Sequence, residues 1–177
     1  MNTKKNDAAE FRVYFADLAE FNAGRHVGGW LTPSDYADAS ELQAAITALM
    51  LSPEHEHAAH DSEGIKIREH EALDAIIAIA RACEEWGCEK VQAAIDHGIA
   101  SDLESIGEAI AEHDGGEWQS ATHWAEEYIS GCYDLDKMLG TLAAYFDYES
   151  FARDAELSGD LSFVQLLNGN VWVLNHH

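Results

Sequence analysis

The chain has 177 residues, and 47% of them are hydrophobic, which is enough apolar material to fold around a core and excludes a wholly disordered acidic tail. Its 33 acidic residues face only 10 lysines and arginines, which gives a formal net charge of −23. These few cations form no basic patch of the kind that phosphate contacts need, so the composition argues against binding of nucleic acid by the chain.

Cysteine usage and hydropathy both indicate a reducing, aqueous compartment. The three cysteines, Cys83, Cys88 and Cys132, are odd in number and form no C-x-x-C pair, which is typical of reduced thiols that serve packing. No apolar signal segment follows the two early lysines, and the longest apolar run, 75–80, is far too short to span a bilayer. We therefore expect a soluble, cytoplasmic protein.

The first third of the sequence predicts a small sheet with one helix. The segments typical of strands are 11–16 and 27–31, and the polar segment 54–64 could hold one more strand. Ser40 and Gln43 have the spacing of a capping box for a helix that runs through about Leu51. We expect residues 1–66 to form an N-terminal α+β domain.

The middle of the chain has the period of amphipathic helices. Helices are expected over 69–86, 89–97 and 102–113. Gly87 is placed to cap the end of the first, and Ser101 with Glu104 forms a capping box for the last. We expect an all-helical middle domain over residues 67–114.

The last third predicts helices followed by a hairpin. The sequence Asp114-Gly115-Gly116 favours a linker or turn, and Ser120 can cap a helix through Ile129. Two short helices and two hairpin strands are expected over 136–143, 148–154, 163–167 and 171–174. We expect residues 115–177 to form a C-terminal α+β domain, so the fold class of the whole chain is α+β, with sheet at both ends and helices between.

Unneutralised acid spans most of the molecule, because two intervals, 26–65 and 91–136, contain no Lys or Arg. We call the second interval, residues 91–136, the acid-only stretch. Its carboxylates are Asp96, Asp102, Glu104, Glu108, Glu112, Asp114, Glu117, Glu126, Glu127, Asp134 and Asp136. A solvated face kept for solubility is the ordinary explanation for surface acid. The size of this imbalance instead favours negative charge presented to a basic protein, with these eleven carboxylates as the partner-binding residues.

One cluster of ligand-type side chains requires a separate interpretation. His55, His57, His60, Asp61 and Glu63 lie within nine residues, which could suggest zinc, but the spacing is not H-E-x-x-H and no cysteine is near. We interpret the histidines as surface residues. The chain also has no P-loop and no nucleophile elbow, so we expect no catalytic residue, no metal and no cofactor.

Aromatic residues gather near the end of the chain. Tyr145, Phe146, Tyr148 and Phe151 precede the predicted hairpin, which itself contains Trp172. Most aromatic side chains belong to cores, but this group could exceed what one small domain buries and leave an apolar face. These five residues are therefore the candidates for self-association.

Four segments, taken in order, resemble the landmarks of the ArdA family of antirestriction proteins. They are LAEFNAGRHVGGWL after the opening strand, HAAHDSEGI, YFDYESFARD and the closing VWVL, and together they extend from about Val13 to Leu174. The most specific positions are Asn22, Gly24, Trp30, His60, Asp61, Glu63, Gly64, Tyr145, Asp147, Tyr148, Ala152, Arg153 and Asp154. The second segment departs from the usual E-W-A-I-H-D-Y-E-G-F, because His57, Ala59, Ser62 and Ile65 replace larger apolar and aromatic members.

The resemblance implies an elongated, three-part molecule that is a homodimer through its C-terminal part. It also implies a mimic of bent duplex DNA that is carried on mobile genetic elements. Such a mimic occupies the DNA-binding site of the core of a type I restriction-modification enzyme and inhibits the enzyme by competition, without catalysis. The alternatives are a general acidic adaptor that binds basic proteins and, third, a small metal-dependent hydrolase that uses the histidine cluster.

Overall fold

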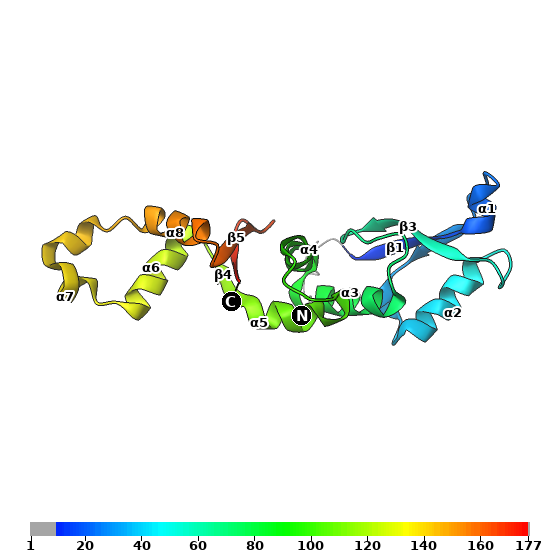
Figure 1. The fold of residues 1–177 in the computed structure, drawn as a ribbon, viewed down its shortest axis with the longest axis horizontal. Coiled ribbons are helices and arrows are strands. Elements are labelled where there is room, and N and C mark those ends of the chain that lie inside the picture. The colour runs from blue at the N-terminus through cyan, green and yellow to red at the C-terminus, as the bar shows by residue number, and fades with distance from the viewer. Residues whose placement is uncertain (1–9, 177) are drawn as a thin grey trace, which may run out of the picture. The chain divides into compact units, whose positions relative to one another are not determined.

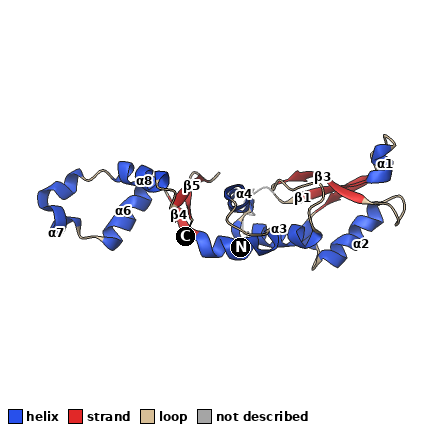
Figure 2. Ribbon diagram, in the orientation of Figure 1, coloured by secondary structure: helices blue, strands red, loops and turns tan. Residues whose placement is uncertain are grey.

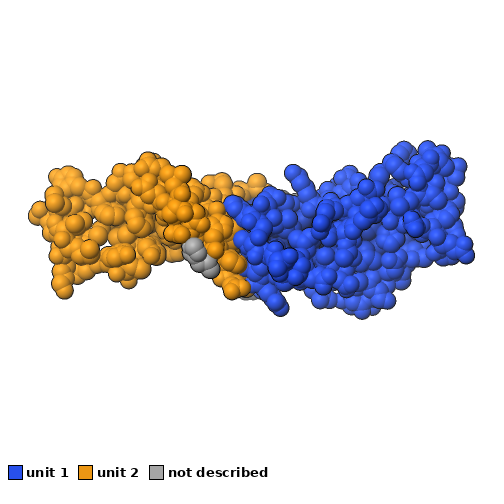
Figure 3. Space-filling model, in the orientation of Figure 1, with its two compact units in different colours: residues 1–110 blue, residues 111–177 orange. Residues whose placement is uncertain are grey.

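The computed structural model describes residues 10–176 and has the predicted α+β class. The chain divides into two compact units, Met1–Ile110 and Ala111–His177, which are coloured separately in Figure 3. The three predicted domain ranges stay predictions.

Unit 1 contains a three-stranded antiparallel sheet in the order β2-β1-β3. The strands are β1 (Arg12–Asp17), β2 (Gly28–Leu31) and β3 (His57–Glu63), which confirms all three predicted strand segments. Because successive side chains of a strand point to opposite faces, Val13, Phe15 and Asp17 share one face of β1, and all three are buried. Tyr14 pairs with Trp30 of β2 and with Asp61 of β3, next to a bulge in the second ladder.

The helical elements of unit 1 are α1 (Leu18–Asn22), η1 (Pro33–Asp35), α2 (Ala39–Leu49), α3 (Leu73–Trp86), α4 (Cys88–His97) and η2 (Leu103–Ser105), and α5 (Ile106–His113) crosses into unit 2. Figure 2 shows α2 against one face of the sheet, and its Leu42 and Ile46 are fully buried. Gly87 ends α3 as predicted, with φ of 84° and its N–H bonded to the Cys83 carbonyl. The predicted helix over 102–113 is instead a 3-10 turn, η2, followed by α5.

Two predicted capping boxes are wrong, because aspartates take the capping positions. Asp38, and not Ser40, accepts the N–H groups at the start of α2, and Asp102, and not Ser101, accepts the Ser105 N–H before α5. A carboxylate at this position accepts a charge-assisted hydrogen bond and also lies favourably in the field of the helix dipole. Part of the chain's acid therefore serves local folding.

Unit 2 contains a second antiparallel sheet in the order β4-β6-β5, with β4 (Asp114–Trp118), β5 (Leu161–Gln165) and β6 (Val171–Asn175). The predicted hairpin is confirmed with shifted bounds. The linker expected at 114–116 is wrong, because these residues begin β4, which is bulged where it pairs with β6. Gly115 is required there, since a Cβ at this position would lie 2.6 Å from Val173 Cγ1.

Four helical elements complete unit 2: α6 (Ala121–Cys132), α7 (Leu135–Leu139), η3 (Gly140–Tyr145) and α8 (Tyr148–Leu157) (Figure 1). Ser120 caps α6 as predicted, because its hydroxyl accepts the His123 N–H at 3.0 Å. Trp124 of α6 and Ala152 of α8 join Leu161 and Val173 of the sheet in one core. By contrast, α7 and η3 contain no buried residue, so this part of the unit presents most of its surface to solvent.

Candidate protein interface on the acidic surface

All eleven predicted carboxylates of the acid-only stretch are exposed. They lie on or directly before α4, η2, α5, β4, α6 and α7. Asp96, Asp102, Glu104 and Glu108 belong to unit 1, and the other seven belong to unit 2. The groups are therefore spread over both units and are not gathered in one pocket.

Six of the eleven carboxylates have no partner within residues 10–176. They are Glu104, Glu108, Glu112, Glu126, Glu127 and Asp136, which we call the unpaired carboxylates, and their side chains make no hydrogen bond or ion pair with the described part of the chain. The other five each accept a hydrogen bond from the fold. The unpaired carboxylates are consequently free to form charge-assisted hydrogen bonds with another molecule.

The local charge balance keeps the surface negative. Unit 2 contains 12 acidic residues and only two Lys or Arg, so its formal net charge is −10. One of those cations, Arg153, already pairs with Asp154 at 3.3 Å. In unit 1, Arg12, Arg25 and Arg68 pair with Glu63, Glu20 and Glu71. Much of the positive charge is thus neutralised internally by carboxylates outside the acid-only stretch.

The best-defined acidic row follows η2 and α5. Glu108 and Glu112 lie one turn apart on α5, while Ile106 and Ile110 of the same helix are fully buried. Glu104 precedes them in the 3-10 turn η2, so only Glu108 and Glu112 are related by the i, i+4 spacing of one α-helix. Hydrogen bonds from Ser105, first of all from its backbone N–H at 2.9 Å, hold the pKa of nearby Asp102 below its usual range.

The predicted self-association residues differ in exposure. Tyr145 is 84% exposed, Phe146, Tyr148 and Phe151 are partly buried, and Trp172 is fully buried within its own unit. Sequence reasoning missed further exposed apolar side chains that precede Tyr145 in unit 2. We call the whole set the apolar arc: Tyr128, Tyr133, Met138, Leu139, Leu142 and Tyr145, contributed by α6, α7, η3 and the residue that follows α6.

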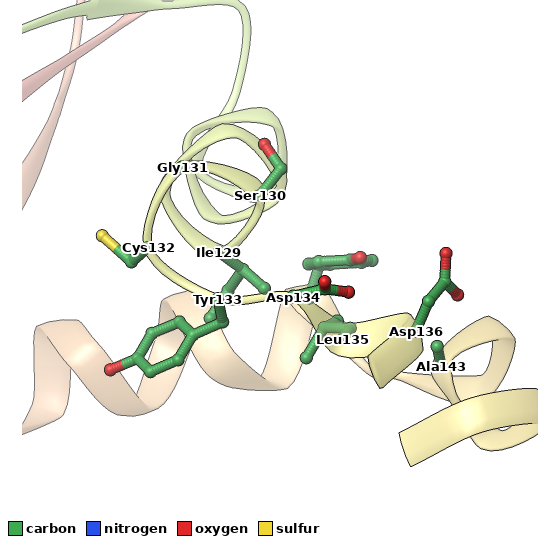
Figure 4. A pocket seen from close by; sticks show the side chains of 10 residues that line it. Ile129, Ser130, Gly131, Cys132, Tyr133, Asp134, Leu135, Asp136 and Ala143 are labelled. Atoms are coloured by element: carbon green, nitrogen blue, oxygen red, sulfur yellow. The ribbon is translucent and has the colours of Figure 1, made fainter. Parts of the chain in front are cut away.

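A cavity of about 680 Å³ lies beside this arc (Figure 4). Its lining includes Ile129 and Cys132 at the end of α6, Tyr133 of the apolar arc, and the carboxylates Asp134 and Asp136. Asp134 also caps α7 through the Lys137 N–H at 3.0 Å. Apolar and acidic groups therefore adjoin one another in this part of unit 2.

The three histidines of the ligand-type cluster make separate contacts. His55 Nδ1 lies 2.8 Å from Asp17 Oδ2, His57 packs edge-on against Phe15, and the His60 ring lies 4.0 Å from that of Phe21. Burial lowers the pKa of His57. Among residues 10–176, no three His, Cys, Asp or Glu side chains are grouped so that they could hold a metal ion.

Comparison with known families assigns the chain to a protein family. The model of the antirestriction protein (ArdA) family matches residues 13–166, which is most of the chain. The chain belongs to the ArdA family. Membership of this family implies an antirestriction function. Comparison with curated proteins finds no match. None of the helices in residues 10–176 has the length and apolar character needed to cross a membrane.

Several ArdA landmarks of the sequence have structural roles. Asp147 caps α8 by accepting the Ser150 N–H at 2.9 Å, and Ala152 is buried in the core of unit 2. Trp30 meets Tyr14 edge-on, with ring centroids 5.6 Å apart. Since these contacts are internal, these three landmarks maintain the fold.

A buried carboxylate of this ArdA chain was missed by sequence reasoning. Asp17 is fully buried and accepts hydrogen bonds from the Glu20 and Leu51 backbone N–H groups and from His55. Burial raises its pKa, but the bonds from His55, Leu51 and Glu20 together outweigh burial and lower it. The alternation of side chains along β1 could have predicted the burial of Asp17, because Asp17 follows Val13 and Phe15 on the inward face.

Proposed function

We propose that this protein is a mimic of DNA that occupies the DNA-binding site of the core of a type I restriction-modification enzyme. It acts stoichiometrically in the cytoplasm, and no bond is made or broken. The observation that carries the proposal is the set of six unpaired carboxylates within a stretch of 46 residues that contains no Lys or Arg. Their negative charge is exposed and is not neutralised by the described part of the chain.

The mechanism follows from what a DNA-binding site offers. Such a site positions the duplex mainly through Lys, Arg and backbone N–H contacts to phosphate oxygens. Exposed carboxylates can accept the same charge-assisted hydrogen bonds. The large net charge would also accelerate encounter with a basic groove by electrostatic steering. DNA and this protein would then exclude each other from the groove.

We further propose that two copies of the chain associate through the apolar arc of unit 2. Each of the six side chains of the arc is at least 40% exposed, and a patch formed by such side chains would be one that single chains rarely leave uncovered. A second copy is the occupant that we favour, because a two-fold axis lets the same patch cover itself. Each protomer would still present its own unpaired carboxylates to the enzyme.

A general acidic adaptor is the runner-up, and it makes a different experimental prediction. An adaptor that responds only to positive charge would bind unrelated basic proteins about as well as a restriction enzyme. A DNA mimic requires carboxylates that match the groove, so it should prefer the enzyme. The hydrolase alternative is not supported by the geometry of residues 10–176, where the histidines contact separate partners.

Competition binding tests the proposal. A purified type I enzyme is loaded with labelled duplex DNA, and increasing amounts of the protein are added while bound DNA is measured. We expect stoichiometric release of DNA, together with loss of DNA cleavage and of methyl transfer by the same enzyme. A histone-like basic protein serves as the specificity control. Binding to that control with equal affinity, without release of DNA from the enzyme, would favour the adaptor.

A further inference from the structure

The turn between β5 and β6 contains an asparagine that is followed directly by a glycine, Asn168-Gly169. Both residues are exposed. Gly169 has no side chain to hinder the approach of its main-chain nitrogen to the Asn168 side chain, and the space that a Cβ would take at Gly169 is open to 4 Å. No other asparagine of the sequence precedes a glycine, so this pair is distinct from the rest.

The Asn168 side chain is held at both of its polar atoms. Its Nδ2 donates to Glu117 Oε1 at 2.7 Å, and its Oδ1 accepts the Asn170 backbone N–H at 2.9 Å. The Gly169 N–H donates to the Leu166 carbonyl at 3.0 Å. The bond to Glu117 joins β4 to the tip of the hairpin, and a charged acceptor makes it stronger than a bond between neutral groups.

We propose that Asn168 is a site of spontaneous deamidation through a succinimide formed with Gly169, and that Glu117 sets the rate of this reaction in the folded protein. Asparagine is a thermolabile residue, and a glycine after it offers the least hindered attacking nitrogen. Because the side-chain amide must depart as ammonia, an acceptor that holds this amide stabilises the reactant. Glu117 therefore slows the reaction without preventing it.

The chemistry needs only water as a co-reactant. The Gly169 nitrogen attacks Asn168 Cγ, the bond from Cγ to Nδ2 breaks, and the proton of the Gly169 N–H leaves with the side-chain amide as ammonia. The cyclic imide then adds water. Opening of the new Cγ–N bond gives aspartate, whereas opening of the original peptide bond gives isoaspartate. The net change is hydrolysis of one amide to a carboxylate and ammonia, with no oxidation or reduction.

Either product alters the contact with Glu117. The amide donor is replaced by a carboxylate, so a hydrogen bond of 2.7 Å becomes repulsion between two like charges. In the isoaspartate product the main chain also passes through the former side chain, which lengthens the turn and moves the Gly169 N–H away from Leu166. The formal net charge of −23 becomes more negative by one unit. We therefore expect the tip of the hairpin to separate from β4.

One tryptic peptide reports the reaction together with its internal controls. Trypsin cleaves after Arg153, and no Lys or Arg follows, so Asn168, Asn170 and Asn175 all lie in peptide 154–177. Full-length protein is incubated in mildly alkaline buffer, sampled over time, digested and analysed by mass spectrometry with fragmentation. We expect conversion at Asn168, while Asn170 and Asn175, which precede bulkier residues, stay amides. Hydroxylamine, which cleaves the main chain at a succinimide, should release residues 169–177.

Three variants test the role of Glu117. Glu117→Ala should accelerate conversion of Asn168 on the order of tenfold, because the acceptor of its amide is gone. Glu112→Ala is the matched control, since it removes an exposed carboxylate of the same unit that has no partner within residues 10–176, and it should leave the rate unchanged. Glu117→Gln keeps an acceptor oxygen without the charge, so its rate should lie between the two.

Two results would overturn the proposal. The first is a folded, unmodified protein that keeps Asn168 as an amide after the same chain in urea has been fully converted, or that converts Asn170 or Asn175 as fast as Asn168. This comparison needs no variant, so a folding defect cannot obscure it. The second is an equal rate of conversion in Glu117→Ala and Glu112→Ala, which would show that the bond to Glu117 does not restrain the amide.

Discussion

The indole Nε1 of Trp172 donates a hydrogen bond of 2.7 Å to the carboxylate of Asp114, which ties the central strand β6 to its neighbour β4. Asp114 Oδ1 also accepts the Gly116 N–H at 3.1 Å, across the bulge of β4. One of the eleven carboxylates predicted to meet a partner thus has a second role inside the sheet. Carboxylates of the acid-only stretch can therefore be separated by experiment into structural and purely surface groups.

Asp114→Ala should destabilise the protein. The substitution removes the hydrogen bond between the Trp172 indole and Asp114, and we expect the free energy of unfolding to fall by about 1–2 kcal/mol in urea titration. Glu112→Ala is the matched control, because Glu112 lies two residues away, is exposed and has no partner within residues 10–176. Equal stability of the two variants would show that the Trp172 bond contributes nothing.

Gly115→Ala should also destabilise unit 2. The added Cβ would lie 2.6 Å from Val173 Cγ1 and 2.9 Å from the Val173 carbonyl oxygen, so backbone must shift at a cost of about 1–3 kcal/mol. Gly131→Ala is the control, since a Cβ there meets nothing within 4 Å and lies in α6. Thermal unfolding should show a lower midpoint for the first variant and an equal or higher one for the second. A Gly115→Ala protein as stable as the unmodified one would contradict this view of the bulge.

The carboxylates of the acidic row of η2 and α5 should contribute additively to inhibition. Each exposed carboxylate contributes on the order of 0.2–1 kcal/mol, so single Gln substitutions of Glu104, Glu108 and Glu112 should change inhibition little. The triple Gln variant should weaken inhibition of DNA cleavage roughly five- to 150-fold, or about 1–3 kcal/mol. The triple Asp variant keeps the charge and should inhibit nearly normally. If one Glu→Gln change abolished inhibition by itself, distributed mimicry would be wrong and a specific site would have to be sought.

Self-association should respond to salt in the opposite sense to inhibition. Two chains of formal net charge −23 repel each other, so screening should strengthen an apolar dimer contact.

Leu142→Gln removes an apolar side chain that is 64% exposed in the arc and should weaken dimerisation about tenfold in light scattering. Leu51→Gln changes a comparably exposed leucine in unit 1 and should have no effect. A dimer that survives Leu142→Gln and dissociates as salt rises would place the contact elsewhere.

Sequence patterns predicted those elements whose signals are local. The strand period of β1, the helix stripe of α3 and the two strand segments of the C-terminal hairpin each specify structure within a few residues, and all three elements formed. The strand β4 was missed because two glycines normally weaken a strand, and only the approach of Val173, from nearly 60 residues away, explains them.

The sequence also predicted some features of the candidate site and missed others. Exposure of the eleven carboxylates followed from their positions between apolar residues, but the structural bonds of Asp114 and Glu117 depend on the distant Trp172, Asn168 and Asn170. The apolar arc was missed because exposure of Met138 or Leu142 is decided by what packs around η3, which a helical pattern does not reveal. Tertiary contacts thus decided what local sequence left open.

The most direct test of charge mimicry is the salt dependence of competition between this protein and DNA on one type I enzyme. Carboxylates in a basic groove displace screening ions much as phosphates do, so affinity should fall on the order of tenfold or more between about 50 and 200 mM salt. DNA release should stay stoichiometric at low salt. A flat salt response, or a stable ternary complex of enzyme, DNA and this protein, would contradict the proposal that its carboxylates take the place of DNA phosphates.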